Sequence, residues 1–214
     1  MRTINLPDYN KKEEFINSFS HGLGAVFSVF GLVLLFLKAK YVSFVAAIGS
    51  FIYGVSLILL YTNSCIYHAL ILPNKKWVFR IIDHCSVFLL EAGTYTPIIL
   101  LSFDKTFSLI LLLIVWGIFI GASILNIIDV DKYDSICVFL NLVMGWGVLV
   151  LCPILINFCG ILGIFLLIFG GVMYSVGSIL YKIGSKRRYF HSIFHFFVLL
   201  GSVMHFIMIY YCFL

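Results

Sequence analysis

Two histidines, His191 and His195, lie four residues apart in the apolar segment RRYFHSIFHFFVLLGSVMHF near the end of the chain. Residues four apart on an α-helix face the same way, so both imidazoles can bind a single metal ion. Neutral imidazole is a common ligand of zinc and of other transition metals. The alternative is that the two histidines form a hydrogen-bonded or interfacial pair within the helix.

Three further polar residues lie near the ends of other apolar stretches. They are His68 and Ser64 in the segment NSCIYHAL and Asp83 in the segment RIIDHCSVF. Ionisable groups inside a membrane are costly, and they mark function or a paired structural role. With His68 as a third ligand, the site would have the three histidines and open position of a catalytic zinc, which activates a water molecule. Asp83 would then orient that water or a ligand, and Ser64, one helical turn before His68, could bond the same water.

The composition is that of an integral membrane protein. Of 214 residues, 63% are hydrophobic and only 11% are charged, whereas soluble domains have about half and about a quarter, respectively. The net charge of +5 does not indicate a nucleic-acid partner, because the basic residues lie between apolar runs and act as topology determinants. We therefore expect the lipid bilayer as the partner of a multi-pass protein of the cell membrane.

A transmembrane helix needs about 20 apolar residues, and the sequence predicts an all-α bundle of seven such helices. Short polar turns are expected at Lys38–Lys40, at Asp104-Lys105 and between Asn157 and Gly160. A short cytoplasmic segment, 1–18, precedes the first span, and 1–214 is expected to form a single domain. The seven predicted spans are near 19–37, 42–62, 80–102, 106–127, 136–156, 160–181 and 190–213.

The distribution of basic residues predicts a cytoplasmic N-terminus and an external C-terminus. With this orientation, 11 of the 14 Lys and Arg residues lie inside and three, Lys38, Lys40 and Lys105, lie outside, as the positive-inside rule requires. The helix ends that carry the histidines and Asp83 then fall in the same leaflet. The inner residues are Arg2, Lys11, Lys12, Lys75, Lys76, Arg80, Lys132, Lys182, Lys186, Arg187 and Arg188.

Several blocks of the chain resemble a known family. SCIYHAL, RIIDHCSVFLLEAGTYTP and HSIFHFFVLLGSVMHF are similar to the signature blocks of the hemolysin III proteins, within the wider progestin and adipoQ receptor family. EEFINSFSHGLGAVF resembles the N-terminal block, with Glu14, Asn17 and His21 in order. At Glu91 this chain departs from the family, which usually has an aliphatic residue there. The resemblance covers essentially the whole chain.

The resemblance implies a seven-helix fold with the N-terminus inside and a zinc ion in the inner leaflet. The implied ligands are His68, His191 and His195, with Asp83 and Ser64 beside the metal-bound water. It also implies a bacterial inner-membrane protein, and the family is grouped with alkaline ceramidases as membrane hydrolases.

These observations favour a zinc-dependent intramembrane hydrolase that acts on an amide or ester bond of a lipid. Two other functions remain open. One is a pore-forming haemolysin that lyses cells, and the other is a membrane sensor or transporter in which the metal is structural. The sequence leaves the lipid, the oligomeric state and the role of Glu91 undetermined.

Overall fold

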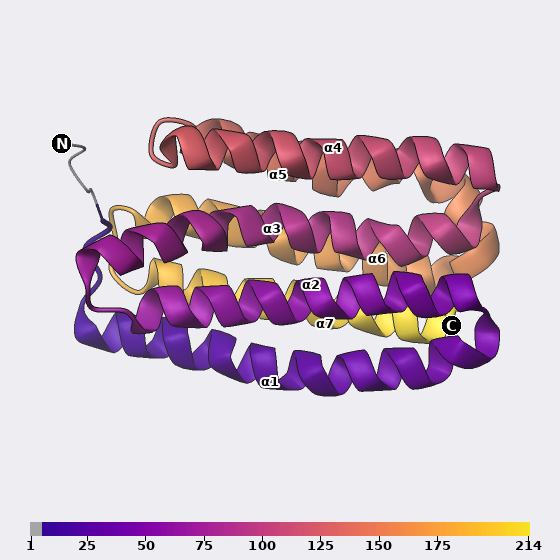
Figure 1. Ribbon diagram of the computed structural model, residues 1–214, viewed down its shortest axis with the longest axis horizontal. Helices are drawn as coiled ribbons and strands as arrows, with labels where there is room; N and C mark the ends of the chain where they lie inside the picture. Colours follow the sequence, from indigo (N-terminus) through magenta and orange to yellow (C-terminus); the bar gives the residue numbers. More distant parts are fainter. Residues whose placement is uncertain (1–5) are drawn as a thin grey trace.

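The computed structural model describes residues 6–214, and these residues form long α-helices with no strand among them. Arg2, one of the basic residues used to predict the orientation, lies outside the described residues. The helices pack side by side along one axis, and the described chain begins at one end of the bundle and ends at the other (Figure 1). The helices are α1 (Lys11–Val42), α2 (Phe44–Ala69), α3 (Pro73–Ser102), α4 (Lys105–Asp129), α5 (Asp134–Gly147), α6 (Cys152–Gly184) and α7 (Phe190–Met208).

Local capping interactions fix where several helices begin. The Asn10 side chain accepts hydrogen bonds from two backbone N–H groups of α1, and Glu13 bonds back to the Asn10 backbone, which completes a capping box. Ser43 and Asp104 cap α2 and α4 in a similar way, through side-chain oxygens that accept backbone hydrogen bonds. The helices therefore extend beyond the apolar runs, because their ends are set by caps and not by hydropathy.

The predicted turn at Lys38–Lys40 is wrong, since these residues lie within α1. The chain reverses instead at Ser43, a single extended residue between α1 and α2. Lys38 is accommodated within α1, where its ammonium donates a hydrogen bond of 2.7 Å to the carbonyl of Tyr210 near the end of the chain.

Six helical stretches of the described chain are long and apolar enough to cross a membrane. The fifth, Asp134–Gly184, comprises 51 residues, far more than the roughly 20 that one span needs. This stretch folds back on itself, as is shown by the hydrogen bond of 2.9 Å that the Trp146 indole donates to the Ser175 hydroxyl. Gly160 has non-helical backbone angles, with φ 62° and ψ −175°, in the region where the sequence predicted a turn between two spans.

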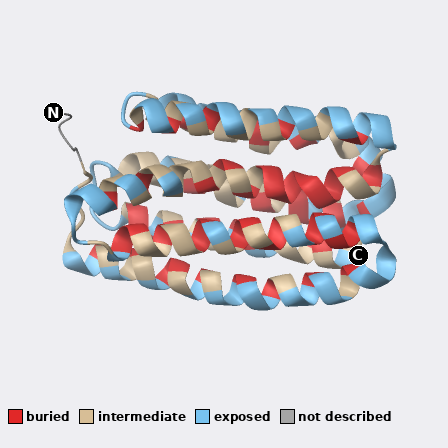
Figure 2. Cartoon of the chain, in the orientation of Figure 1, coloured by how far each residue is buried: buried red, intermediate tan, exposed pale blue. Residues whose placement is uncertain are grey.

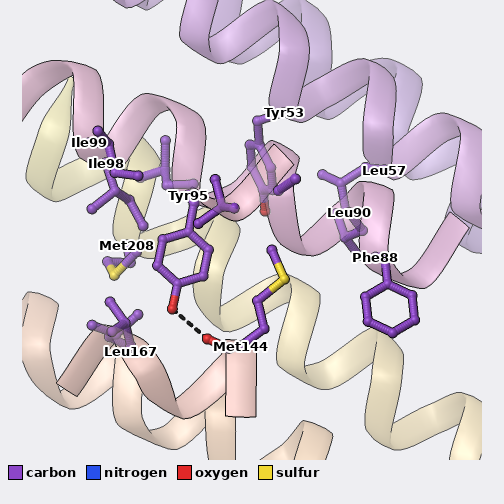
Figure 3. Close-up of a cluster of buried hydrophobic side chains, with 14 of the residues drawn as sticks. Tyr53, Leu57, Phe88, Leu90, Tyr95, Ile98, Ile99, Met144, Leu167 and Met208 are labelled. Atoms are coloured by element: carbon purple, nitrogen blue, oxygen red, sulfur yellow. Dashed lines mark hydrogen bonds between the residues drawn. The ribbon is translucent and has the colours of Figure 1, made fainter. Parts of the chain in front are cut away.

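Apolar side chains lie both inside the bundle and on its outer surface. Figure 2 shows exposed residues along the outer faces of the helices and buried residues where helices meet, and many of the exposed ones are large and apolar, such as Phe27 and Ile161. In the core, the Tyr95 hydroxyl donates a hydrogen bond of 2.6 Å to the carbonyl of Met144 and so joins α3 to α5 (Figure 3). This is the pattern of an α-helical membrane protein, whose outer surface faces lipid.

Candidate metal centre

Three histidines from two helices meet inside one end of the bundle. His68 lies in the last turn of α2, and His191 and His195 lie in the first two turns of α7. The Nε2 atom of His191 is 3.4 Å from Nε2 of His68 and 3.1 Å from Nε2 of His195. The three side chains are almost completely buried.

The geometry of this cluster fits a metal ion. One ring nitrogen from each histidine lies within 4.8 Å of the others. Ligand nitrogens at about 2.0–2.1 Å from a tetrahedral zinc ion are separated by about 3.3 Å from one another, which is close to the two Nε2 separations in the cluster. Among the described residues, the buried Nδ1 of His191 has no hydrogen-bond partner. The converging Nε2 atoms are the ones placed to bind a cation.

A carboxylate on α1 orients the His68 ring. The Glu14 Oε2 atom is 2.6 Å from Nδ1 of His68, and the Lys76 ammonium donates a 2.6 Å hydrogen bond to the other oxygen of the same carboxylate. The Asn17 amide nitrogen also lies 3.4 Å from Nδ1. A carboxylate at the second nitrogen of a histidine fixes its tautomer and makes the first nitrogen a better ligand. His68 thus has the support that metal-binding histidines require.

Two further rings pack on the cluster. Tyr9, from the segment before α1, stacks on His191 with ring centroids 4.7 Å apart, and His21 of α1 stacks on His195 at 3.7 Å. Burial raises the pKa of the Tyr9 phenol, so this ring stays neutral. Neither ring nitrogen of His21 meets the geometry of a hydrogen bond with any described residue, so His21 is able to bond a ligand beside the cluster.

A cavity of about 140 Å³ begins next to the histidines and extends along the interior of the bundle. Ser64, Asp83 and His21 line it near the cluster. Both Ser64 and Asp83 line the cavity, so the structure brings these two predicted residues together at its wall. Ser64 is also one turn before His68 on α2, as the spacing predicted.

Three other polar residues lie away from the histidine cluster. His205 lies further along α7, with Nε2 3.2 Å from the carbonyl of Leu167, and His84 packs edge-on against Tyr181. Glu91 lines the deeper part of the cavity, and its buried Oε2 has no hydrogen-bond partner. None of the three belongs to the histidine cluster.

Sequence reasoning missed the roles of Glu14 and Tyr9. For Glu14 a signal existed, because Glu14, Asn17 and His21 are spaced three and four residues apart and so share one face of α1. Their pattern did not show that this face meets His68. Tyr9 precedes the helix, and no sequence periodicity could have placed its ring against His191.

The fold and the site define a class: a multi-pass α-helical membrane protein with a three-histidine cluster buried at one end of its bundle. Residues 9–206 match the family described as "Haemolysin-III related". The chain is 37% identical to "Hemolysin-3" of Bacillus cereus over 197 residues, which cover 91% of this chain and 89% of that protein. It is 38% identical to the "Hemolysin-3 homolog" of Bacillus subtilis (strain 168) over 204 residues, which cover 94% and 95%, respectively.

The chain therefore belongs to the haemolysin III family, and the resemblance seen in its motifs is confirmed. No solved structure matches the chain.

Proposed function

We propose that this protein is a zinc-dependent intramembrane hydrolase that cleaves an amide or ester bond of a lipid. The observation that carries the proposal is the placement of three converging imidazoles beside a cavity whose wall includes Ser64 and Asp83. A structural zinc site more often has four protein ligands. Three ligands leave one position for water or substrate, which favours catalysis.

The residues of the site have distinct roles in this proposal. His68, His191 and His195 would hold the metal, which would supply Lewis acidity and lower the pKa of a water molecule. Asp83 would orient that water and accept its proton, because Asp83 lines the cavity next to the cluster, together with Ser64. Glu14 would keep His68 in the tautomer that presents Nε2 to the metal.

A lipid substrate is supported by the surroundings of the site. Polar and apolar side chains both line the cavity, but most of its surface is apolar, with side chains such as Leu60, Val87 and Ile98. A lipid could keep its acyl chain in such surroundings while its polar linkage reaches the histidine end. Water-soluble substrates would gain little from this lining.

We further propose that the chain crosses the bacterial inner membrane seven times as a single domain, with the N-terminus inside. The two arms of Asp134–Gly184, before and after Gly160, would each form one span. In Figure 1 the described chain begins at one end of the bundle and ends at the other, which supports an odd number of crossings. The excess of basic residues at the end with the histidine cluster supports the cytoplasmic location of that end. Single cysteines at Ser43 and Ser185 of a cysteine-free variant should react with an impermeant reagent from opposite sides. Labelling of both from one side would contradict this topology.

Metal analysis is the first test of the proposal. Protein purified in detergent should contain about one zinc per chain, and His191→Ala/His195→Ala should lose it. His205→Ala is the matched control, because it removes a histidine of the same helix that lies outside the cluster. If the wild type has no metal after zinc is supplied, or if the control loses as much metal as the double variant, the metal site is wrong.

Turnover is the second test. A panel of lipid amides and esters should yield a product with the wild type and none with Asp83→Asn, while zinc stays bound to the variant. Full turnover by Asp83→Asn would refute the role of Asp83. Absence of a product from every lipid, with zinc bound, would favour a structural metal in a sensor or transporter.

The names of the two Bacillus relatives favour a second candidate function, which is lysis of cells through a pore. Vesicles that contain the purified protein and a trapped dye distinguish the two functions. A pore releases the dye without zinc and leaves the lipid intact, whereas a hydrolase forms a lipid product that depends on zinc.

A further inference from the structure

A second hollow lies on the bundle, between α5 and α6 at the end where the histidines are. This basic groove has an apolar wall, formed mainly by Val138 and Leu142 of α5 and by Ile179 and Ile183 of α6, and its volume is about 660 Å³. Three cationic residues, Lys182, Lys186 and Arg187, line its outer end together with Phe190.

The cationic residues of the groove differ in their partners. Lys182 is neutralised, because its ammonium bonds the Asp134 carboxylate and the Ser135 hydroxyl. Lys186 and Arg187 are exposed, and their side chains form no ion pair with any residue in the part of the chain that the structure describes. Two uncompensated positive charges therefore stand together at the end of the groove.

The apolar wall begins next to these charges and continues into the bundle. Ser178, where the groove ends, lies six residues before the end of α6, which is about 9 Å at 1.5 Å per residue. Ile179 has 61% of its surface exposed, so the wall is open to lipid. Leu142 and Ser178 also line the central cavity, so the two hollows share a wall.

We infer that the basic groove binds an anionic phospholipid, with its phosphate at Lys186 and Arg187 and an acyl chain along the apolar wall. Basic pockets between transmembrane helices bind anionic headgroups in this way, because the charge attraction is strong at the membrane surface and the acyl chain stays in an apolar environment. A free phosphate would form ion pairs with Lys186 and Arg187, but it would leave the apolar wall of the groove without a partner. This inference does not depend on the hydrolase proposal.

The test compares dioleoylphosphatidylglycerol with dioleoylphosphatidylcholine, which share acyl chains but differ in net charge. Binding of each lipid to the detergent-purified full chain is measured by native mass spectrometry. A basic side chain near an anionic lipid favours binding about fivefold. The anionic lipid should therefore bind about thirtyfold tighter than the zwitterionic one, and Lys186→Gln/Arg187→Gln should remove most of this preference.

Two more variants distinguish specific lipid binding in the groove from non-specific attraction to surface charge. Lys11→Gln/Lys12→Gln removes two exposed charges at the same end of the bundle and should keep the preference. Ile179→Trp fills the groove without changing any charge, and it should weaken binding of the anionic lipid at least fivefold.

Any of the following results would overturn the inference. One is an unchanged preference in Lys186→Gln/Arg187→Gln, another is an equal loss in Lys11→Gln/Lys12→Gln, and another is no loss in Ile179→Trp. The last is displacement of the bound phosphatidylglycerol by millimolar inorganic phosphate, which would assign the charges to a soluble phosphate.

Discussion

Replacement of Glu14 by glutamine should weaken metal binding without removing any metal ligand. In the wild type, the Glu14 carboxylate lies 2.6 Å from Nδ1 of His68 and places a negative charge behind this ring. Glutamine keeps the size of the side chain and an oxygen that can accept the same hydrogen bond, but it lacks the charge. The Nε2 atom of His68 then becomes a poorer donor to a cation.

The size of the effect follows from the position of Glu14 directly behind a ligand. Loss of such a partner weakens metal affinity about 10-fold to 100-fold, or about 1.4 to 2.8 kcal/mol. We expect the upper half of this range, because His68 is buried and solvent cannot replace the lost charge. The change should appear in the zinc dissociation constant, measured by competition with a chromophoric chelator at fixed pH.

Glu14 also bonds Lys76, so a control must separate the two contacts. Lys76→Gln breaks the ion pair but leaves the carboxylate on His68. It should change zinc affinity less than threefold, while both variants keep the helical content of the wild type. If Lys76→Gln weakens zinc binding as much as Glu14→Gln, or if Glu14→Gln binds zinc as tightly as the wild type, orientation of His68 by Glu14 is refuted.

Three other substitutions should change stability, measured as the free energy of unfolding in detergent. Gly184→Ala should lower it by about 1–3 kcal/mol, because the new Cβ would lie 2.7 Å from a backbone nitrogen at the start of α7. Gly117→Ala, within α4 and with nothing within 4 Å of the new Cβ, should not lower it. Equal losses would show that packing is not the cause. Tyr95→Phe should cost about 1 kcal/mol through its lost bond to a carbonyl of α5, and no change would mean that this bond is not formed. Glu91→Leu should raise stability by about 1 kcal/mol, since the buried Oε2 has no partner, and a fall would reveal a partner for the carboxyl.

The sequence alone determined the class of protein and the histidine ligands to be tested. Long apolar runs can satisfy their backbone groups in a bilayer only as helices or closed barrels, so composition and run length were enough to predict a helical membrane protein. The spacing of His191 and His195 placed them on one helix face because the helical period is fixed. The three-histidine cluster, with His68 as its third member, was likewise expected from the sequence and is present in the structure.

Only the tertiary structure decided which side chains from distant segments meet. Glu14 and His68 are 54 residues apart, and no local pattern specifies that one face of α1 packs against the end of α2. The Lys38 ammonium donates a hydrogen bond to a carbonyl 172 residues away in the sequence. This long-range contact accommodates Lys38 within a helix, where the sequence suggested a turn. Helix packing also places Tyr9 against His191 and brings the side chains of the basic groove together. Helical period and hydropathy act over a few residues, whereas these contacts depend on how whole helices pack.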